Sequence, residues 1–170
     1  MPIVDVHRCR ITVDPGYHMG LSVWDEAAWG AVVGPITTAL LSIPRKLDAK
    51  LEWPQKCEYI LTAFDKFLCN QLLMRKVVEV AVEMPQNLES QKGKVAARRD
   101  DVIHLAYLVG MMSGTCNMRG VPFRPVPVKE WIGQMHKALV IKRIEKRLGI
   151  VYPNHIADSV GLGLYLKGHF

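Results

Sequence analysis

Residues 77–85 have the sequence VVEVAVEMP, a near-continuous run of β-branched side chains that ends in an acid and a proline. Apolar runs without alternation are typical of strands buried on both faces, as in sheets that helices cover on both sides. We therefore expect Val77–Val82 to be a central strand of a layered domain, with Glu83 at its carboxyl end.

The segments on either side of this strand alternate between strand and helix patterns. Apolar residues recur every three or four positions from Cys57 to Leu72, which predicts a helix, and Pro54 suits its first turn. In chain order we expect strands at Arg10–Val13, Gly20–Trp24 and Trp29–Thr37, a helix from Pro54, the strand Val77–Val82, a polar loop at Gln86–Lys94, a helix at Arg98–Ser113, an edge strand within Val121–Val128, a basic helix at Lys137–Leu148, and a last helix with Asn154 as its N-cap. This order predicts an α/β fold with a mixed sheet.

The composition fits one domain spanning residues 1–170. With 49% apolar residues, the chain is too hydrophobic to be disordered, and its length is too short for a two-domain kinase-like ATPase. It has no apolar run of roughly 18 residues and no signal-peptide core at its start, so we expect a cytoplasmic protein with no membrane partner. Four cysteines without a C-x-x-C pair are expected to be buried thiols. The net charge of +6 permits a polyanionic partner without requiring one.

Acidic residues occur where strand and helix ends can bring them together. Asp14 follows the first expected strand, Glu83 ends the apolar strand, and His155 and Asp158 are three residues apart on the last helix. Ligand sites of open α/β sheets collect at the carboxyl ends of strands, and oxygen ligands with one imidazole suit Mg²⁺ or Mn²⁺. The pattern is compatible with a metal site at this edge of the sheet.

Each of these residues also has an ordinary explanation. Asp14 before Pro-Gly can cap a turn, and Glu83 can pair with a lysine. His155 can lie in solvent in the first helical turn, and Asp158 there can interact with the helix dipole. The residues alone leave both interpretations open.

Two groups of basic residues could contact phosphates. Lys142, Arg143, Lys146 and Arg147 lie on the outer side of the basic helix, a pattern that by default is only a solvated face. A second group, Lys92, Lys94, Arg98 and Arg99, follows Glu83 and flanks the expected site. Phosphate contacts of this kind position DNA without reading its sequence.

Four motifs, in order over residues 11–166, resemble RuvC-type Holliday junction resolvases. The segments ITVDPG (11–16) and GLSV (20–23) resemble the first hairpin of that family. The segment VAVEMPQ (80–86) is similar to the family's second acidic strand, in the form seen in phage members. The segment PVKEWIGQ (127–134), followed by Lys137, resembles the approach to the family's basic helix. HIADSVGLGL (155–164) looks like its terminal His-x-x-Asp helix with a small-residue packing face.

The resemblance implies an RNase H-like mixed five-stranded sheet with flanking helices. It also implies a homodimeric, Mg²⁺-dependent endonuclease, of a bacterial or phage-infected cell, that nicks opposing strands of a four-way DNA junction to give 5′-phosphate and 3′-hydroxyl ends. Asp14, Glu83, His155 and Asp158 would hold two Mg²⁺ ions, which Mn²⁺ could replace. DNA contacts are expected from Lys129, Gln134 and Lys137 by this resemblance, and from Lys92, Lys94, Arg98, Arg99 and Lys142 by their charge and position.

The chain departs from the family pattern at one position, and two other functions compete with the resolvase hypothesis. Cellular members often carry an aromatic residue three positions after the strand glutamate, where this chain has Gln86. One alternative is another RNase H-like nuclease, acting on branched DNA or on RNA–DNA hybrid. Exonucleases of this class usually have Asp-x-Glu on the first strand, and this chain lacks that motif at Asp14. The other is a non-catalytic protein that binds DNA structures, which the complete acid set argues against.

Overall fold

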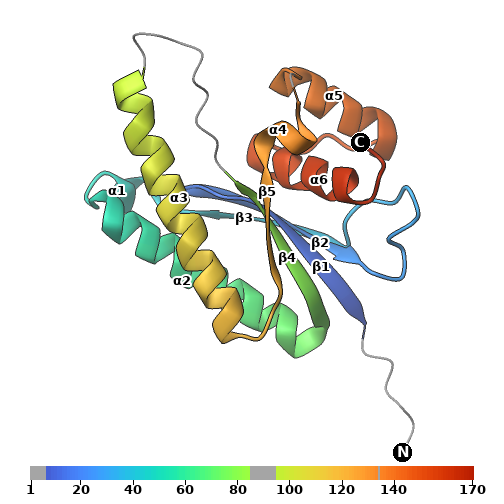
Figure 1. The fold of residues 1–170 in the computed structure, drawn as a ribbon, viewed down its shortest axis with the longest axis horizontal. Helices are drawn as coiled ribbons and strands as arrows, with labels where there is room; N and C mark the ends of the chain where they lie inside the picture. The colour runs from blue at the N-terminus through green and yellow to red at the C-terminus, as the bar shows by residue number, and fades with distance from the viewer. Residues whose placement is uncertain (1–6, 85–94, 134) are drawn as a thin grey trace, which may run out of the picture.

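A five-stranded mixed sheet forms the centre of the protein in a computed structural model, which describes the backbone of residues 7–84, 95–133 and 135–170 and their side chains except at 95–101. The strand order is β3-β2-β1-β4-β5 (Figure 1). The strands are β1 Arg8–Asp14, β2 His18–Asp25, β3 Thr37–Ser42, β4 Lys76–Met84 and β5 Phe123–Pro127. The first three strands form an antiparallel meander, and β4 and β5 run parallel to β1. The mixed five-stranded sheet is thus confirmed, with β5 on its edge.

Helices cover both faces of this sheet. The helices α1 Arg45–Asp48, α2 Trp53–Met74 and α3 Val95–Met118 lie on one side, and α4 Val128–Trp131, α5 Lys137–Leu148 and α6 Asn154–Leu166 gather on the other (Figure 1). Alternation along β1 separates the two layers: Ile11 and Val13 pack with α2 and α3, while Thr12 faces α6. The basic helix α5 has the bounds that its sequence predicts.

Small residues bring α6 directly onto the sheet and its neighbouring helix. A Cβ at Gly20 of β2 would collide with the backbone carbonyl of His155, and one at Gly163 would collide with the indole of Trp24. At Gly161 an added Cβ would lie 2.8 Å from the ring of Trp131. Glycine at these three positions therefore sets how closely the first turn and middle of α6 approach the sheet.

Buried hydroxyl groups then hold α6 in register with β1 and β2. The Thr12 hydroxyl donates to the carbonyl of Ser159 at 2.7 Å and accepts the Trp24 Nε1–H at 2.9 Å. The hydroxyls of Ser22 and Ser159 are 2.7 Å apart. Because buried polar groups are costly when unpaired, these bonds favour one placement of the helix.

Two local predictions are wrong. Trp29–Thr37 is not a strand. Its start is folded by turns in which Trp29 N–H donates to Glu26 O (3.1 Å) and Ala31 N–H to Ala28 O (3.1 Å). Contact with β2 begins where Ile36 N–H donates to Val23 O (2.7 Å), and the strand β3 begins at Thr37. Asn154 is not the N-cap of α6; Pro153 holds that position with an extended ψ of 151°, and no side chain caps the helix.

The remaining expectations are confirmed or extended. The helix predicted at Arg98–Ser113 runs longer, as α3, and the short helices α1 and α4 were not predicted. Cys9, Cys57 and Cys116 are buried and Cys69 is partly buried, all with free thiols. The loop predicted at Gln86–Lys94 lies outside the described residues. Within the described ranges, none of the helices combines the length and apolarity that crossing a membrane requires.

Candidate metal centre

Three side chains from β1 and α6 converge at one edge of the sheet. Asp14 is the last residue of β1, and His155 and Asp158 lie in the first turns of α6, on one face. One potential ligand atom from each lies within 4.8 Å of the other two. His155 Nδ1 and Asp14 Oδ2 form a hydrogen bond of 2.9 Å. Gly20, opposite Asp14 in the β1–β2 register, permits this meeting because it leaves room for the backbone of His155.

Glu83 lies near the carboxyl end of β4, next to this group. Its Oε2 accepts the indole N–H of the buried Trp131 at 3.1 Å. Burial, followed by the charges of Asp14 and Asp158, raises the pKa of Glu83 from 4.5 to about 8, although the Trp131 bond and the charge of Lys137 act in the opposite direction. The third predicted acid therefore interacts electrostatically with the cluster, but Trp131 holds its carboxylate and Glu83 is not one of the three residues whose ligand atoms lie within 4.8 Å of one another.

Burial disfavours the ionised forms of the carboxylates in this cluster. Burial raises the pKa of Asp14, an effect that its bond to His155 partly offsets. The same bond raises the pKa of His155, so that the imidazolium form is favoured. Lys137, the first residue of α5, also contacts the cluster, because its Nζ donates to Asp158 Oδ2 at 2.6 Å. Buried carboxylates of this kind are stabilised by cations, and their oxygen atoms suit a hard divalent ion.

The other predicted DNA contacts are not all visible. Lys129 on α4 and Lys142 on α5 are exposed. Lys92, Lys94, Gln134 and Gln86, and the side chains of Arg98 and Arg99, lie outside the described residues. Among the predicted phosphate contacts, Lys137 lies against the acid cluster, where it pairs with Asp158.

Sequence reasoning missed two neighbours of the cluster. The ring of His18, at the start of β2, lies 5.9 Å from the ring of His155. The proximity of His18 to His155 depends on the turn between β1 and β2, and no pattern in the local sequence predicts it. Trp131 lies in a quoted motif, but its bond to Glu83 joins positions 48 residues apart and could not be inferred from spacing.

Comparisons with known proteins identify the fold. No family model and no curated protein sequence matches the chain. A structure of RuvC from Thermus thermophilus superposes with a TM-score of 0.60 at 17% identity, covering 95% of this chain and 97% of the other. The fold is of the RuvC type. The same protein in complex with a Holliday junction substrate gives a TM-score of 0.61 at 15% identity, with the same coverage of both chains. The expected RNase H-like architecture is thereby confirmed.

Proposed function

We propose that this RuvC-like chain is a metal-dependent endonuclease that resolves four-way DNA junctions. The observation that carries the proposal is the buried acid cluster, in which Asp14, His155 and Asp158 present ligand atoms within 4.8 Å at the edge of a RuvC-type sheet. The similarity to a RuvC that was solved with a Holliday junction substrate supports the choice of substrate.

The donor set fits two Mg²⁺ ions. Asp14, Glu83 and Asp158 are partly or fully buried carboxylates, and burial above all raises the pKa of Asp14 and of Glu83, so bound cations would stabilise their ionised forms. Asp14 would be the shared ligand, because it ends the strand β1 and interacts electrostatically with Glu83, His155 and Asp158. Glu83 and Asp158 would complete the two separate shells, with His155 beside one of them. When bound, two divalent ions activate a water for attack on a phosphodiester and stabilise the leaving 3′ oxygen.

The chain's own cations have distinct roles in this proposal. His155 orients the Asp14 carboxylate through its Nδ1 and can hold a proton there, since that bond raises its pKa. Lys137 neutralises Asp158 in the structure. The side chain of Lys137 is half-exposed, so its Nζ could also contact a DNA phosphate if a divalent ion neutralised Asp158.

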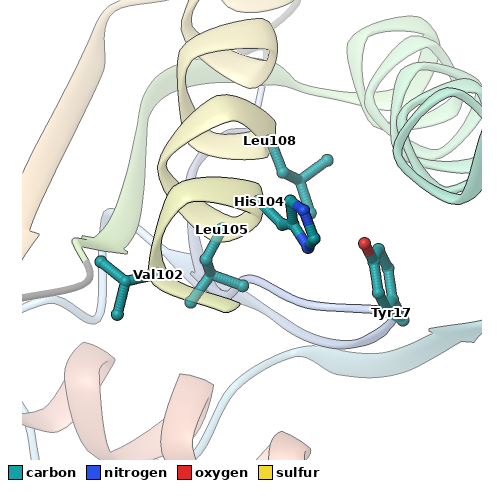
Figure 2. Close-up of a pocket in the computed structure, with 5 residues that line it drawn as sticks. All are labelled: Tyr17, Val102, His104, Leu105 and Leu108. Atoms are coloured by element: carbon teal, nitrogen blue, oxygen red, sulfur yellow. The ribbon is translucent and has the colours of Figure 1, made fainter. Parts of the chain in front are cut away.

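Resolution of a junction needs two cuts, whereas each chain has one such cluster, so we propose a two-fold symmetric dimer formed through α3. Ile103 on α3 is 59% exposed, and Tyr107 one turn later is 47% exposed, whereas Leu108 is buried. An apolar pocket of about 250 Å³ is lined by the neighbouring α3 residues. Figure 2 shows Val102, His104, Leu105 and Leu108 of α3 on one side of this pocket and Tyr17 on the other.

A substitution on α3 tests the dimer. Ile103→Asp should give monomers in sedimentation, because it buries an unpaired charge at the contact. Leu73→Asp is the matched control, since Leu73 on α2 is 85% exposed and lies on a different helix. A wild-type monomer that makes paired, symmetric cuts at nanomolar concentration would contradict the dimer.

The cleavage test compares a four-way junction, a linear duplex and an RNA–DNA hybrid, each with Mg²⁺ and with EDTA. We expect Mg²⁺-dependent paired nicks in the junction. Asp14→Asn should abolish them while junction binding persists, because it removes one ligand charge and lowers repulsion toward phosphate. Asp25→Asn, at the end of β2, is the matched control and should cut normally. Near-normal cleavage by Asp14→Asn would show that Asp14 is not part of the active site. Cleavage of the RNA–DNA hybrid alone would show that the four-way junction is not the substrate.

A further inference from the structure

The indole of Trp131 lies between Glu83 and the helix α6. Trp131 ends the one-turn helix α4, which directly follows β5, and β5 pairs with β4 so that Val126 lies opposite Glu83. The indole Nε1–H donates to Glu83 Oε2 at 3.1 Å. At the far end of the same ring system, Cζ3 leaves no room for a side chain at Gly161 of α6, where an added Cβ would lie 2.8 Å away. One planar group therefore links the strand of Glu83 to α6.

The contact with α6 falls one turn from a proposed metal ligand. Asp158 and Gly161 are three residues apart on α6, and residues at this spacing are neighbours on the surface of a helix. Because an indole is a rigid plane with no rotatable bond between its two ends, the separation that it sets is fixed. Trp131 therefore determines where the Glu83 carboxylate lies relative to the turn of α6 that carries Asp158.

Packing holds the indole itself in one orientation. Trp131 is only 3% exposed and belongs to a cluster of buried side chains that includes Val140 and Ile144 of α5. The ring of Phe170 meets the indole edge-on, with centroids 5.5 Å apart. The guanidinium of Arg143 lies over the ring of Phe170 in turn, 5.5 Å from its centroid. The indole N–H is therefore directed at one carboxylate oxygen.

This hydrogen bond sets Glu83 apart from the other proposed ligands. Ligand atoms of Asp14, His155 and Asp158 lie within 4.8 Å of one another, and Glu83 is not one of these three residues. Oε2 of Glu83 accepts the Trp131 N–H, which leaves Oε1 for a cation. Centres with two metals hold their ions about 3.5–4 Å apart, so each ion needs a ligand of its own besides the shared one.

From this arrangement we infer that Trp131 is a positioning residue for a second cation. Its indole keeps the Glu83 carboxylate beside the group of Asp14, His155 and Asp158 instead of within it, so that Glu83 and Asp14 form a second cation site. The inference rests on the proposed metal centre, and it assigns the choice between one ion and two to a residue that is not itself a ligand. Hydrogen-bond partners of ligating groups typically change metal affinity by about 10- to 100-fold.

The first test counts the ions that the protein binds without DNA. Mn²⁺ is titrated into the protein while free Mn²⁺ is followed by electron paramagnetic resonance, and wild type should take up two ions per chain. Trp131→Phe keeps an aromatic ring and removes the N–H, so it should weaken binding of the second ion by about 10- to 100-fold and leave the first unchanged. A single ion in wild type, unchanged binding by the variant, or equal weakening of both ions would each overturn the inference.

Trp29→Phe is the matched control. Trp29 packs against the same cluster of buried side chains, where its indole meets Trp24 and lies beneath the guanidinium of Arg10. The control makes the same chemical change at a distance from Glu83, and it should bind both ions as wild type does. Loss of the second ion in this control as well would contradict a specific role for Trp131.

A double variant separates positioning from a general loosening of the fold. Because Trp131 acts through Glu83, W131F/E83Q should bind Mn²⁺ as Glu83→Gln alone does, and further weakening would overturn the inference. Phe170→Ala keeps the indole N–H but removes the ring that packs on it, so it should weaken the second ion less than Trp131→Phe. If Trp131→Phe does not fold, Phe170→Ala in the wild-type and Glu83→Gln backgrounds decides in the same way.

Cleavage of a four-way junction with Mg²⁺ separates this inference from the proposed function. If wild type cuts junctions and Trp131→Phe binds both ions as wild type does, the positioning role is excluded and the nuclease function stands. If Trp131→Phe weakens the second ion alone but wild type cuts no junction, the positioning role stands and the resolvase function falls.

Discussion

Replacement of Glu83 by glutamine should stabilise the metal-free protein at pH 8 and abolish Mg²⁺-dependent cleavage. The ionised carboxylate is disfavoured in the fold, because burial and the charges of Asp14 and Asp158 raise its pKa. Glutamine has the same shape and keeps an oxygen that can accept the Trp131 N–H. It removes the charge that the metal-free fold tolerates poorly, and it also removes a proposed ligand.

The magnitude follows from the shift of the Glu83 pKa from 4.5 to about 8. A shift of 3.5 units at 1.36 kcal/mol per unit corresponds to about 5 kcal/mol well above pH 8, and to about 4 kcal/mol at pH 8, where half of the groups are ionised. Since the folded state binds the proton more tightly than the unfolded chain, the free energy of unfolding should fall as the pH rises from 4.5 to 8.

Urea unfolding in EDTA at pH 5 and at pH 8 measures this effect. We expect wild type to lose stability between the two pH values and Glu83→Gln to lose much less. Glu79→Gln is the matched control on the same strand: Glu79 pairs with Arg10 at 3.1 Å, so its neutralisation should not stabilise the protein. If Glu83→Gln is no more stable than wild type at pH 8 in EDTA, the electrostatic account of the cluster is wrong.

Three further predictions concern α6 and its partners. His155→Ala should lower cleavage less than Asp158→Ala at fixed Mg²⁺, because imidazole is a poor ligand for this hard ion; equal losses in single-turnover rates would contradict the ranking. In an NMR titration without metal, the pKa of His155 should lie above 6.5 and fall in Asp14→Asn, which removes the charge that raises it; an unchanged value would exclude the bond. Gly163→Ala should destabilise the fold by a few kcal/mol in urea unfolding, because its Cβ would collide with a buried indole, whereas Gly110→Ala, in open space within α3, should stabilise it by up to about 1 kcal/mol.

The sequence was sufficient to predict most of the architecture. The apolar run Val77–Val82, the proline-interrupted edge strand and the basic helix Lys137–Leu148 are set by burial and turn chemistry between near neighbours, and all three occur as expected. The Trp29–Thr37 prediction failed although the two valines and the isoleucine give a strand-like composition, because Trp29 packs against Trp24 and turns fold the segment until Ile36 reaches β2.

The sequence also located the acids at strand and helix ends, and the fold brings Asp14, His155 and Asp158 together. Their service as metal ligands remains a prediction. What only the tertiary structure decided is the choice of partners: His155 with Asp14 across 141 positions, Trp131 with Glu83 across 48, and Arg143 with Phe170 across 27. Local sequence patterns encode which residues are buried and where the chain turns. These pairings depend instead on how α5 and α6 pack on the sheet. Gly20 and the glycines of α6 permit the close approach of α6, and buried hydroxyl groups hold it in register.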